Sequence, residues 1–245
     1  EFMKGLTNET STGRTRFDNA SGQGNWNIHP AFNYGSTVSG IWVAKFEASN
    51  SGGKIKVEPG VSSWRSITVN DIYTNCLNYN KTLNSHMMKN DEWGAVAYLS
   101  KSKYGKNAEV TINSNSSYYT GGGSGNAYVS NIGQSTTGTV HGVYDMSGGA
   151  WEYVAAYVNN GNSSLTSYGS SLVNGDAKTK NVYSKGSSDD RDSNYSANSG
   201  KYGDAVYETS VNGNSSNSSW YGDDSYFPDT NSPFFLRGAF YGAGT

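Results

Sequence analysis

The sequence predicts one domain of the α+β class, with two early helices, short antiparallel strands and unusually long loops. Residues 39–47 alternate between two sets of side chains as a half-buried strand does. Two segments with apolar residues at helical spacing follow, one near residues 68–83 and one starting near Asn90. After Gly105 the chain consists of short strand-like runs separated by turn signals. Such a combination of strand and helix segments is typical of the α+β class.

The composition is that of a folded chain with a lean core. Hydrophobic residues account for 34% of the 245 residues and charged residues for 16%, while aromatic residues reach 13%. This is not the charge-rich, aromatic-poor composition of a disordered chain. No fixed-period repeat and no composition shift after residue 25 marks a boundary. We expect a poorly ordered lead-in over residues 1–25 and a single domain over residues 26–245.

The first expected element is the strand over residues 39–47, with one face in the core. Trp42, Ala44 and Phe46 fall on the same side of this strand. Residues 49–60 are rich in Ser, Gly and Lys, and we expect them to form a loop that contains a short strand.

Capping signals mark both predicted helices. Thr68, followed three residues later by Asp71, resembles a capping box with Asp in place of the usual Glu. The apolar positions of this helix are Ile72, Cys76, Leu77 and Leu83. The second helix has Asn90 as its expected N-cap, acidic residues in its first turn where the helix dipole favours them, and an end at Gly105.

Charge, hydropathy and cysteine content exclude several functions. The net charge is −2 and no stretch concentrates Lys and Arg, so nucleic acid is not an expected partner. No apolar run reaches the roughly 18–20 residues of a membrane helix, so we expect no membrane insertion of this chain. The single cysteine, Cys76, excludes an internal disulfide framework and a multi-cysteine zinc site.

The sequence offers little support for hydrolytic or phosphate chemistry. It lacks a G-x-S-x-G motif, and its histidines, His29, His86 and His141, stand at unrelated spacings. We therefore expect surface or structural roles for all three. Residues 121–125 are rich in Gly but lack the Lys of a P-loop, and are expected to form a flexible turn.

One acidic segment resembles the start of a calcium loop. Asp190, Asp192 and Asn194 occupy its first three ligand positions. Tyr195 stands where an EF-hand needs Gly, and Lys201 where it needs a bidentate Glu, so an EF-hand is excluded. A looser calcium site and a solvated acidic loop remain as alternatives.

Three glutamates lie in otherwise apolar segments. Glu47, Glu92 and Glu152 would each lose free energy on burial unless paired or hydrogen-bonded. We expect buried structural carboxylates that hold loop backbone amides. A pair of them acting as acid and base in glycoside hydrolysis is the less favoured alternative.

Four segments resemble the formylglycine-generating-enzyme family, also called sulfatase-modifying factors. Residues 141–153 (HGVYDMSGGAWEY) are similar to its G-L-Y-D-M-x-G-N-V-W-E-W signature. Three weaker similarities follow the family's order: residues 40–47 to its G-F-W-V-G-K-Y-E strand, residues 92–97 to its E-W-E-Y-A-A helix, and residues 236–240 to its R-G-G-S-F turn. The resemblance implies the C-type-lectin-like fold of that family.

Because Trp42, Trp93 and Trp151 each lie inside one of these apolar segments, we expect all three to be largely buried. We also expect Cys76, which lies in a predicted helix, to be a small core hydrophobe.

The sequence differs from the family at positions that matter for catalysis and for calcium binding. Its enzymes depend on cysteines in a segment after the R-G-G-S turn, whereas this sequence stops at Thr245 with its only cysteine far upstream. We expect no cysteine-dependent oxidase activity, no cofactor, and a C-terminus shortened relative to the family. Gly149 stands where the family has an Asn near a calcium site, which leaves Asp145 and Glu152 as calcium candidates.

Non-enzymatic proteins on the same fold include phage receptor-binding proteins and bacterial surface proteins diversified by diversity-generating retroelements. The 19 Tyr and 31 Gly, together with many Ser and Asn, resemble the composition of antibody paratopes. We expect a non-enzymatic ligand-binding or display protein outside the cell, on a bacterial surface or phage particle, that recognises a glycan or a protein. The alternatives are a structural component of a larger surface assembly and a formylglycine-generating-type oxidase.

The C-terminal loop region is the expected place of ligand contact. Residues 219–241 combine aromatic side chains with Asp and Asn, and Pro228 and Pro233 stiffen the path. Stiff loops lose less entropy on binding, and aromatic anchors dominate binding hot spots. The expected contacts are Trp220, Tyr221, Tyr226, Phe240 and Tyr241. For Trp220 and Phe240, packing beneath the loops is an equally supported alternative.

Overall fold

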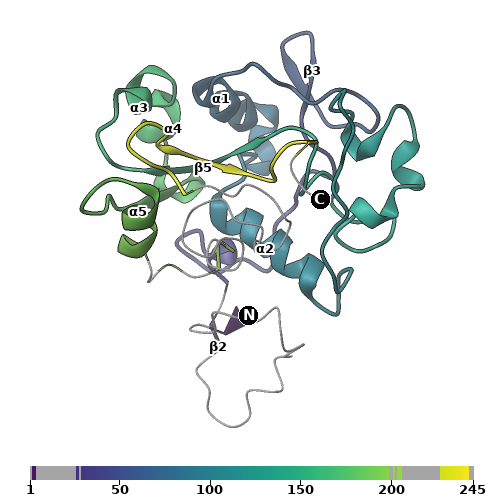
Figure 1. Cartoon of the computed structure of the whole chain (residues 1–245), viewed down its shortest axis with the longest axis horizontal. Coiled ribbons are helices and arrows are strands. Elements are labelled where there is room, and N and C mark those ends of the chain that lie inside the picture. Colours follow the sequence, from purple (N-terminus) through teal and green to yellow (C-terminus); the bar gives the residue numbers. More distant parts are fainter. Residues whose placement is uncertain are drawn as a thin grey trace.

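The computed structural model of the chain is a mixed α and β structure with few helices and small sheets, which confirms the α+β class (Figure 1). The structure describes residues 2–3, 26–27, 29–198, 201, 203–205 and 227–242. Within that part of the chain, no helix is long and apolar enough to cross a membrane. Most of the expected lead-in lies outside the described residues, so the division at residue 25 stays a prediction.

The centre of the fold is a three-stranded sheet. Strand β5 (Glu152–Val158) lies between β6 (Asn181–Tyr183) and β7 (Phe234–Arg237). β7 pairs antiparallel to β5, with Glu152 opposite Arg237, whereas β6 pairs parallel to it. The expectation of antiparallel strands is therefore wrong for β6. Parallel neighbours need a crossover connection, which the two short helices between β5 and β6 provide.

Strand β5 is buried on both faces, because successive side chains of a strand point to opposite sides. Val154 and Val158 join one core cluster with Trp93, and Ala155 and Tyr157 join a second one. Helix α2 (Asn90–Lys101) covers the first face. Helices α1 (Val69–Tyr79), α3 (Ser163–Ser167) and α4 (Ser170–Asn174) cover the second. Figure 1 shows α1 and α2 on opposite sides of β5.

The two early helices are confirmed, with shifted ends. Thr68 is the N-cap of α1 and accepts a hydrogen bond from the Asp71 amide, as predicted. The helix ends before Leu83, which falls in a separate 3₁₀ turn and is exposed. The N-cap of α2 is Lys89, one residue before the expected one, because its backbone amide donates to the Glu92 carboxylate.

The predicted strand over residues 39–47 is wrong. The segment is irregular, and the hairpin of β3 (Ser49–Ser51) and β4 (Lys54–Lys56) begins after it. Trp42 is fully exposed, which contradicts its expected burial, whereas Phe46 packs against the ring of Tyr144. Alternation describes the side chains of one segment and cannot show whether another strand pairs with it.

The second half of the chain holds more helix than expected. In addition to α3 and α4, helix α5 (Arg191–Ala197) forms where a loop was predicted. The side chains of Asn162 and Asp190 accept hydrogen bonds from backbone amides at the starts of α3 and α5. These polar residues resemble turn signals in the sequence but serve here as helix caps.

The remaining elements are short. They are β1 (Phe2–Met3), β2 (Trp26–Asn27), η3 (Pro30–Phe32), η4 (Lys81–Leu83), η5 (Thr120–Gly122), η6 (Ala127–Val129), η7 (Ile132–Gln134) and η8 (Ala177–Thr179).

Candidate functional site

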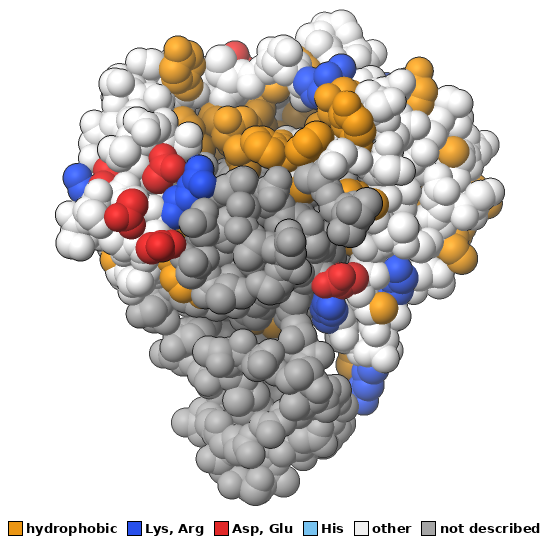
Figure 2. All heavy atoms as spheres, in the orientation of Figure 1, with side chains coloured by type: hydrophobic (Ala, Val, Ile, Leu, Met, Phe, Trp, Pro, Cys, Tyr) orange, Lys and Arg blue, Asp and Glu red, His pale blue; other side chains and the backbone are white. Residues whose placement is uncertain are grey.

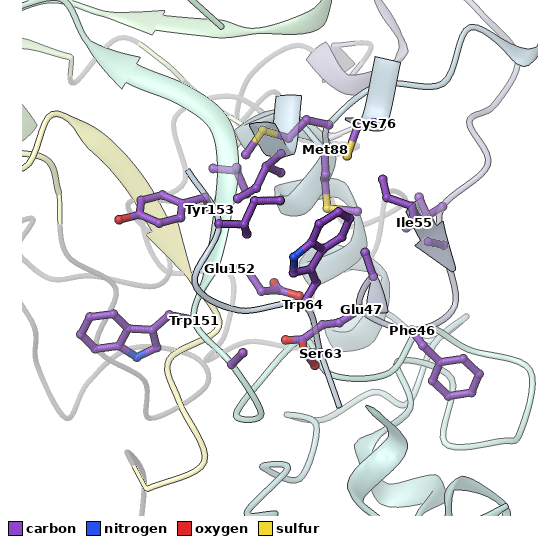
Figure 3. Close-up of a pocket in the computed structure, with 18 of the residues that line it drawn as sticks. Phe46, Glu47, Ile55, Ser63, Trp64, Cys76, Met88, Trp151, Glu152 and Tyr153 are labelled. Atoms are coloured by element: carbon purple, nitrogen blue, oxygen red, sulfur yellow. The ribbon is translucent and has the colours of Figure 1, made fainter. Parts of the chain in front are cut away.

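A cavity of about 220 Å³ opens beside the start of β5. The β3–β4 hairpin, α1 and the segment before α2 contribute its other walls. The walls are mainly apolar and include Ile55, Trp64, Cys76, Met88, Trp151 and Tyr153 (Figure 3). On the face seen in Figure 2, hydrophobic side chains gather around a hollow over the region of β5 and β7. Concave, mostly apolar sites of this kind are where small groups usually bind.

Two carboxylates lie at one end of the cavity. Figure 3 shows Glu47 and Glu152 there, with Trp64 beside them. The Ser63 hydroxyl donates to Glu47 Oε2. Glu152 Oε2 accepts a hydrogen bond of 3.1 Å from the indole nitrogen of Trp93 in α2. Glu47 Oε1 is shut off from solvent and has no hydrogen bond of ordinary geometry with any described residue.

The surroundings disfavour a charged Glu47. Burial raises the pKa of Glu47 well above its usual value, and the negative charges of Glu152 and Asp145 raise it further. Hydrogen bonds from the Ser63 hydroxyl and the Ala150 backbone amide lower the pKa of Glu47, but they do not offset the effects of burial and of the neighbouring charges. Among the described residues no Lys or Arg forms an ion pair with Glu47.

Asp145 is the third carboxylate of this group. It is fully buried, and burial raises its pKa to about 6. Its carboxylate accepts hydrogen bonds from the Asn113 side chain at 2.9 Å and from the Gly121 amide at 2.9 Å. Gly121 is itself buried, so the part of the glycine-rich segment nearest Asp145 is tied to the interior and is not the flexible turn that was expected.

The calcium candidates do not come together. Asp145 and Glu152 both act on Glu47, whereas Asp190, Asp192 and Asn194 belong to the start of α5. Asp190 caps that helix, and the buried Asn194 side chain bonds the Asp189 carboxylate, so the expected acidic loop is a helix here, although Asp190 and Asp192 are exposed to solvent as expected. Within the described ranges, no group of three or more His, Cys, Asp or Glu side chains is arranged to hold a metal ion.

Trp151, in the cavity wall, begins a row of aromatic side chains, and we call Trp151, Phe240, Tyr241 and Tyr118 the aromatic rim. Trp151 lines the cavity and packs edge-on against Phe240 at 5.8 Å between ring centroids. Phe240 contacts Tyr241 at 5.6 Å, and Tyr241 contacts Tyr118 at 5.1 Å. The guanidinium of Arg65 lies 3.7 Å from the centroid of the Tyr118 ring.

The structure can be compared with what was expected of Trp151 and of the five predicted ligand contacts. Trp151 is 43% exposed, so its predicted burial is wrong: it precedes β5, and its ring meets that of Phe240 edge-on. Of the expected ligand contacts, Phe240 packs against the cavity-lining Trp151, and Tyr241 packs against Phe240. The other three, Trp220, Tyr221 and Tyr226, fall outside the described residues.

Several residues of the site were not predicted. Trp64, Arg65 and Tyr118 lie in irregular segments, far along the chain from residues 219–241. The only sequence signal was an aromatic side chain in a segment without apolar periodicity. An aromatic side chain in such a segment can be exposed for contact with a partner or packed in the interior, so this signal does not distinguish the two.

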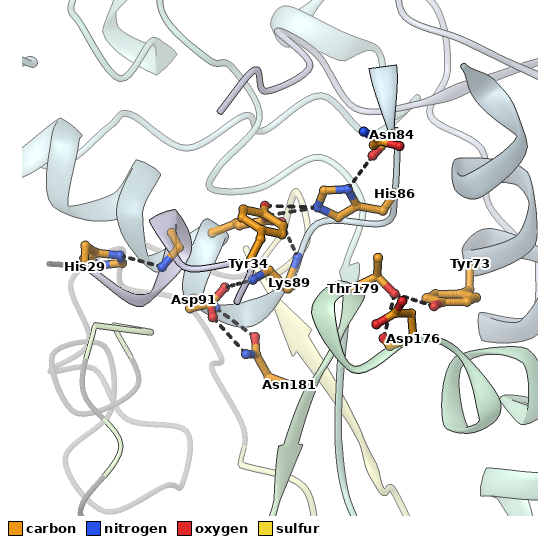
Figure 4. Close-up of polar contacts among 12 residues, drawn as sticks. His29, Tyr34, Tyr73, Asn84, His86, Lys89, Asp91, Asp176, Thr179 and Asn181 are labelled. Atoms are coloured by element: carbon orange, nitrogen blue, oxygen red, sulfur yellow. Dashed lines mark hydrogen bonds and ion pairs between the residues drawn. The ribbon is translucent and has the colours of Figure 1, made fainter. Parts of the chain in front are cut away.

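The third glutamate, Glu92, belongs to a polar cluster with Tyr34, His86 and Lys89, which Figure 4 shows close together. It is buried and accepts hydrogen bonds from the Tyr34 hydroxyl and the Lys89 amide, and His86 Nε2 lies 2.9 Å from its Oε1. Burial would raise the pKa of Glu92, but His86 and Tyr34 lower it, and its carboxylate raises the pKa of His86. Glu92 therefore has the structural role that the sequence indicated.

The histidines also follow expectation. His29 is buried, accepts a hydrogen bond from the Ala31 amide and has its pKa lowered to about 4 by burial. His141 is exposed.

Comparison with protein-family models and with curated proteins finds no match to this chain.

Proposed function

We propose that this chain is a non-enzymatic ligand-binding or display protein that acts outside the cell, on a bacterial surface or phage particle. We place its binding site at the cavity and the aromatic rim. The observation that carries the proposal is the half-exposed Trp151, which contributes to the wall of an apolar cavity and whose ring contacts Phe240, which in turn contacts Tyr241. Aromatic groups clustered at a concavity are typical of binding hot spots.

We also propose the C-type-lectin-like fold, and contacts among the four family-like segments support it. The Trp93 indole of the second segment donates to Glu152 of the third. The guanidinium of Arg237, in the fourth, lies 3.9 Å from the centroid of the Trp93 ring. The amide of Tyr144, in the third, donates to the carbonyl of Lys45 in the first. Motifs spread over 200 residues are therefore packed as one unit.

The chemistry of the cavity favours binding over the oxidase alternative. Cys76 lines the cavity, but burial raises the pKa of its thiol to about 12. A reactive cysteine needs the opposite shift, because the thiolate is the nucleophile. We expect no turnover of a cysteine-containing sulfatase-type peptide with oxygen and copper. Turnover that Cys76→Ser abolishes would contradict the proposal.

The structural alternative is a surface component without a specific ligand. In that case the exposed part of the rim would serve only solubility or assembly. Exposed apolar clusters are costly to keep on a surface, so the rim favours a ligand, either a glycan or a protein.

Binding of the full chain to arrays of glycans and proteins tests the proposal. Once a ligand is found, Trp151→Ala and Tyr241→Ala should each weaken binding at least tenfold. Tyr104→Ala is the matched control, because Tyr104 is 77% exposed and does not line the cavity. The double variant Tyr221→Ala/Tyr226→Ala tests the contacts predicted from sequence. A chain that binds nothing on either array, or binds equally well without the rim side chains, would contradict the proposal.

A further inference from the structure

We infer that the cavity accepts an uncharged aromatic side chain of a protein ligand, with its ring among the sulfur-bearing side chains of the walls. This inference rests on the proposed binding function and names the chemistry that its site recognises. Three observations carry it: the size of the cavity, the concentration of sulfur in its walls, and the exposed aromatic rings that continue from it.

The size of the cavity suits a single ring. Its volume is about 220 Å³. An engineered apolar cavity of about 150 Å³ in another protein binds benzene, so this one has room for such a ring and the methylene group that joins it to a peptide backbone. Ile55, Ile72 and Met88 line the cavity and are only partly buried. A ring seated against them covers apolar surface that the fold leaves accessible, which favours binding.

Sulfur is concentrated in the walls of the cavity. Met87, Met88 and Met146 line it, and they are three of the four methionines in the sequence. Cys76, the only cysteine, lines it as well. Sulfur makes favourable contacts with aromatic rings, and the flexible methionine side chain adapts to the shape of the group that it covers. An aromatic ring therefore gains contacts here that a saturated group of the same size does not.

The sulfur-bearing end of the cavity is separate from the carboxylates. Figure 3 shows Cys76 and Met88 at one end and Glu47 and Ser63 at the other. Taking a charged group out of water into an apolar wall is costly, so the sulfur-bearing end selects an uncharged group. A sugar ring would also be disfavoured there, because most of its hydroxyls would lose their hydrogen bonds to water without replacement. The site therefore favours the protein ligand over the glycan.

The surface beside the cavity favours a side chain over a free aromatic compound. Trp151, in the wall, is 43% exposed and contacts Phe240, which in turn contacts Tyr241. Figure 2 shows hydrophobic side chains gathered around the hollow. A protein that places one ring in the cavity can cover these neighbours with the residues around that ring, as is typical of an anchor residue in a protein interface. A free compound that fits the cavity leaves them uncovered.

The experiment compares two small probes on the full chain. Nα-acetyl-phenylalanine-N-methylamide carries an aromatic ring, and its cyclohexylalanine analogue carries a saturated ring of similar size. Carbon-13 labelling of methionine methyl groups lets NMR follow Met87, Met88 and Met146, with assignments from single Met→Leu variants. The phenylalanine probe should shift these signals saturably and bind at least about threefold more tightly than the cyclohexyl probe, because only an aromatic ring gains from the sulfur contacts. Burial of apolar surface alone predicts the opposite order, since the saturated ring is the more apolar.

Variants then locate the interaction. Ile55→Trp places a larger side chain in the cavity wall and should weaken binding of the phenylalanine probe at least tenfold. Val182→Trp is the matched control, because Val182 also lies in a strand, is 38% exposed and does not line the cavity. The inference fails if folded Ile55→Trp binds the probe as the wild type does. It also fails, whether or not that variant folds, if the wild type binds the cyclohexyl or a lysine analogue equally well, or if the methionine signals do not shift.

Failure of this inference is distinguishable from failure of the proposed function. A protein from the array that binds Ile55→Trp at full strength would refute the ring assignment and leave the binding function standing. Toluene that fills the cavity without weakening the binding of that protein would show that the site takes a free aromatic compound, which also overturns the inference. An array without any ligand would refute the binding function itself.

Discussion

Glu47 sits among two other carboxyl groups, with one oxygen unbonded in the described structure, and this makes its protonation matter for stability. The pKa of Glu47 in the folded protein lies above the usual 4.5. At a pH between these two pKa values, Glu47 therefore keeps its proton in the folded chain but has released it in the unfolded chain. The free energy of unfolding therefore falls as pH rises from about 4.5 through the folded-state pKa.

We expect Glu47→Gln to stabilise the protein at pH 8 and to change its stability less at pH 4.5. The amide keeps the shape and removes the repulsion by Glu152 and Asp145. Denaturant unfolding at both pH values measures the difference from wild type, and Glu109→Gln, at an exposed carboxyl, should show no such difference. A variant that is less stable than wild type at pH 8 would show that the Glu47 charge is well compensated.

Two of the three tryptophans in the family-like segments, Trp93 and Trp151, should respond differently to the same substitution. Trp93 is fully buried at 0% exposure, so Trp93→Ala leaves a cavity and should cost about 3–5 kcal/mol of unfolding free energy. Trp151 is 43% exposed, so Trp151→Ala should cost only about 1–2 kcal/mol, in proportion to the smaller apolar area it buries. Thermal unfolding of both variants measures this, and equal losses would mean that Trp151 is buried in solution.

At the scale of elements, the start of α1 depends on one hydroxyl. Thr68 Oγ1 accepts from the Asp71 amide at 3.1 Å and donates to the Asp71 carboxylate at 2.8 Å. We expect Thr68→Ala to lower the unfolding free energy by about 1 kcal/mol through loss of the cap.

Thr74→Ala is the matched control in the same helix. Thr74 is exposed and bonds only the carbonyl of Asn70 one turn earlier, and Ala has the higher helix propensity, so this change should be neutral or slightly stabilising. Equal losses of stability from the two substitutions would argue against a capping role for Thr68.

The elements that the sequence predicted well are those with local signals. Thr68 and Asp71 mark a helix start because the cap and its partner are three residues apart. The strand over residues 39–47 was predicted from signals within that segment, chiefly alternation, and alternation contains no information about a pairing partner. The same limit applies to β6, whose parallel pairing depends on how the chain from β5 returns through α3 and α4.

At the scale of the whole molecule, β5 joins the two core clusters. Its alternate residues pack with α2 on one face and with α1, α3 and α4 on the other. Unfolding of one cluster would remove β5 from the other as well. We therefore expect the described part of the chain to unfold in one cooperative transition.

Substitutions in each cluster test this coupling. Met146→Ala, in the first cluster, and Leu172→Ala, in the second, should each cost about 2–5 kcal/mol and lower the midpoint of one shared transition. Differential scanning calorimetry measures the number of transitions. Two transitions, each sensitive to only one substitution, would show two independent cores.

The sequence by itself determined the α+β class, the start of α1, the existence of α2 and the burial of Trp93. Each depends on signals within a few residues or within one apolar helix face. Only the tertiary structure decided that Trp42 and Trp151 are exposed, that Glu47 and Glu152 meet at one cavity, and that Asp145 acts on Glu47. Glu47 and Glu152 are more than 100 residues apart in the chain, and charge repulsion gives neither any local preference for the other. The two side chains come together because the surrounding segments pack against β5. The spacing of residues in the sequence does not indicate this packing.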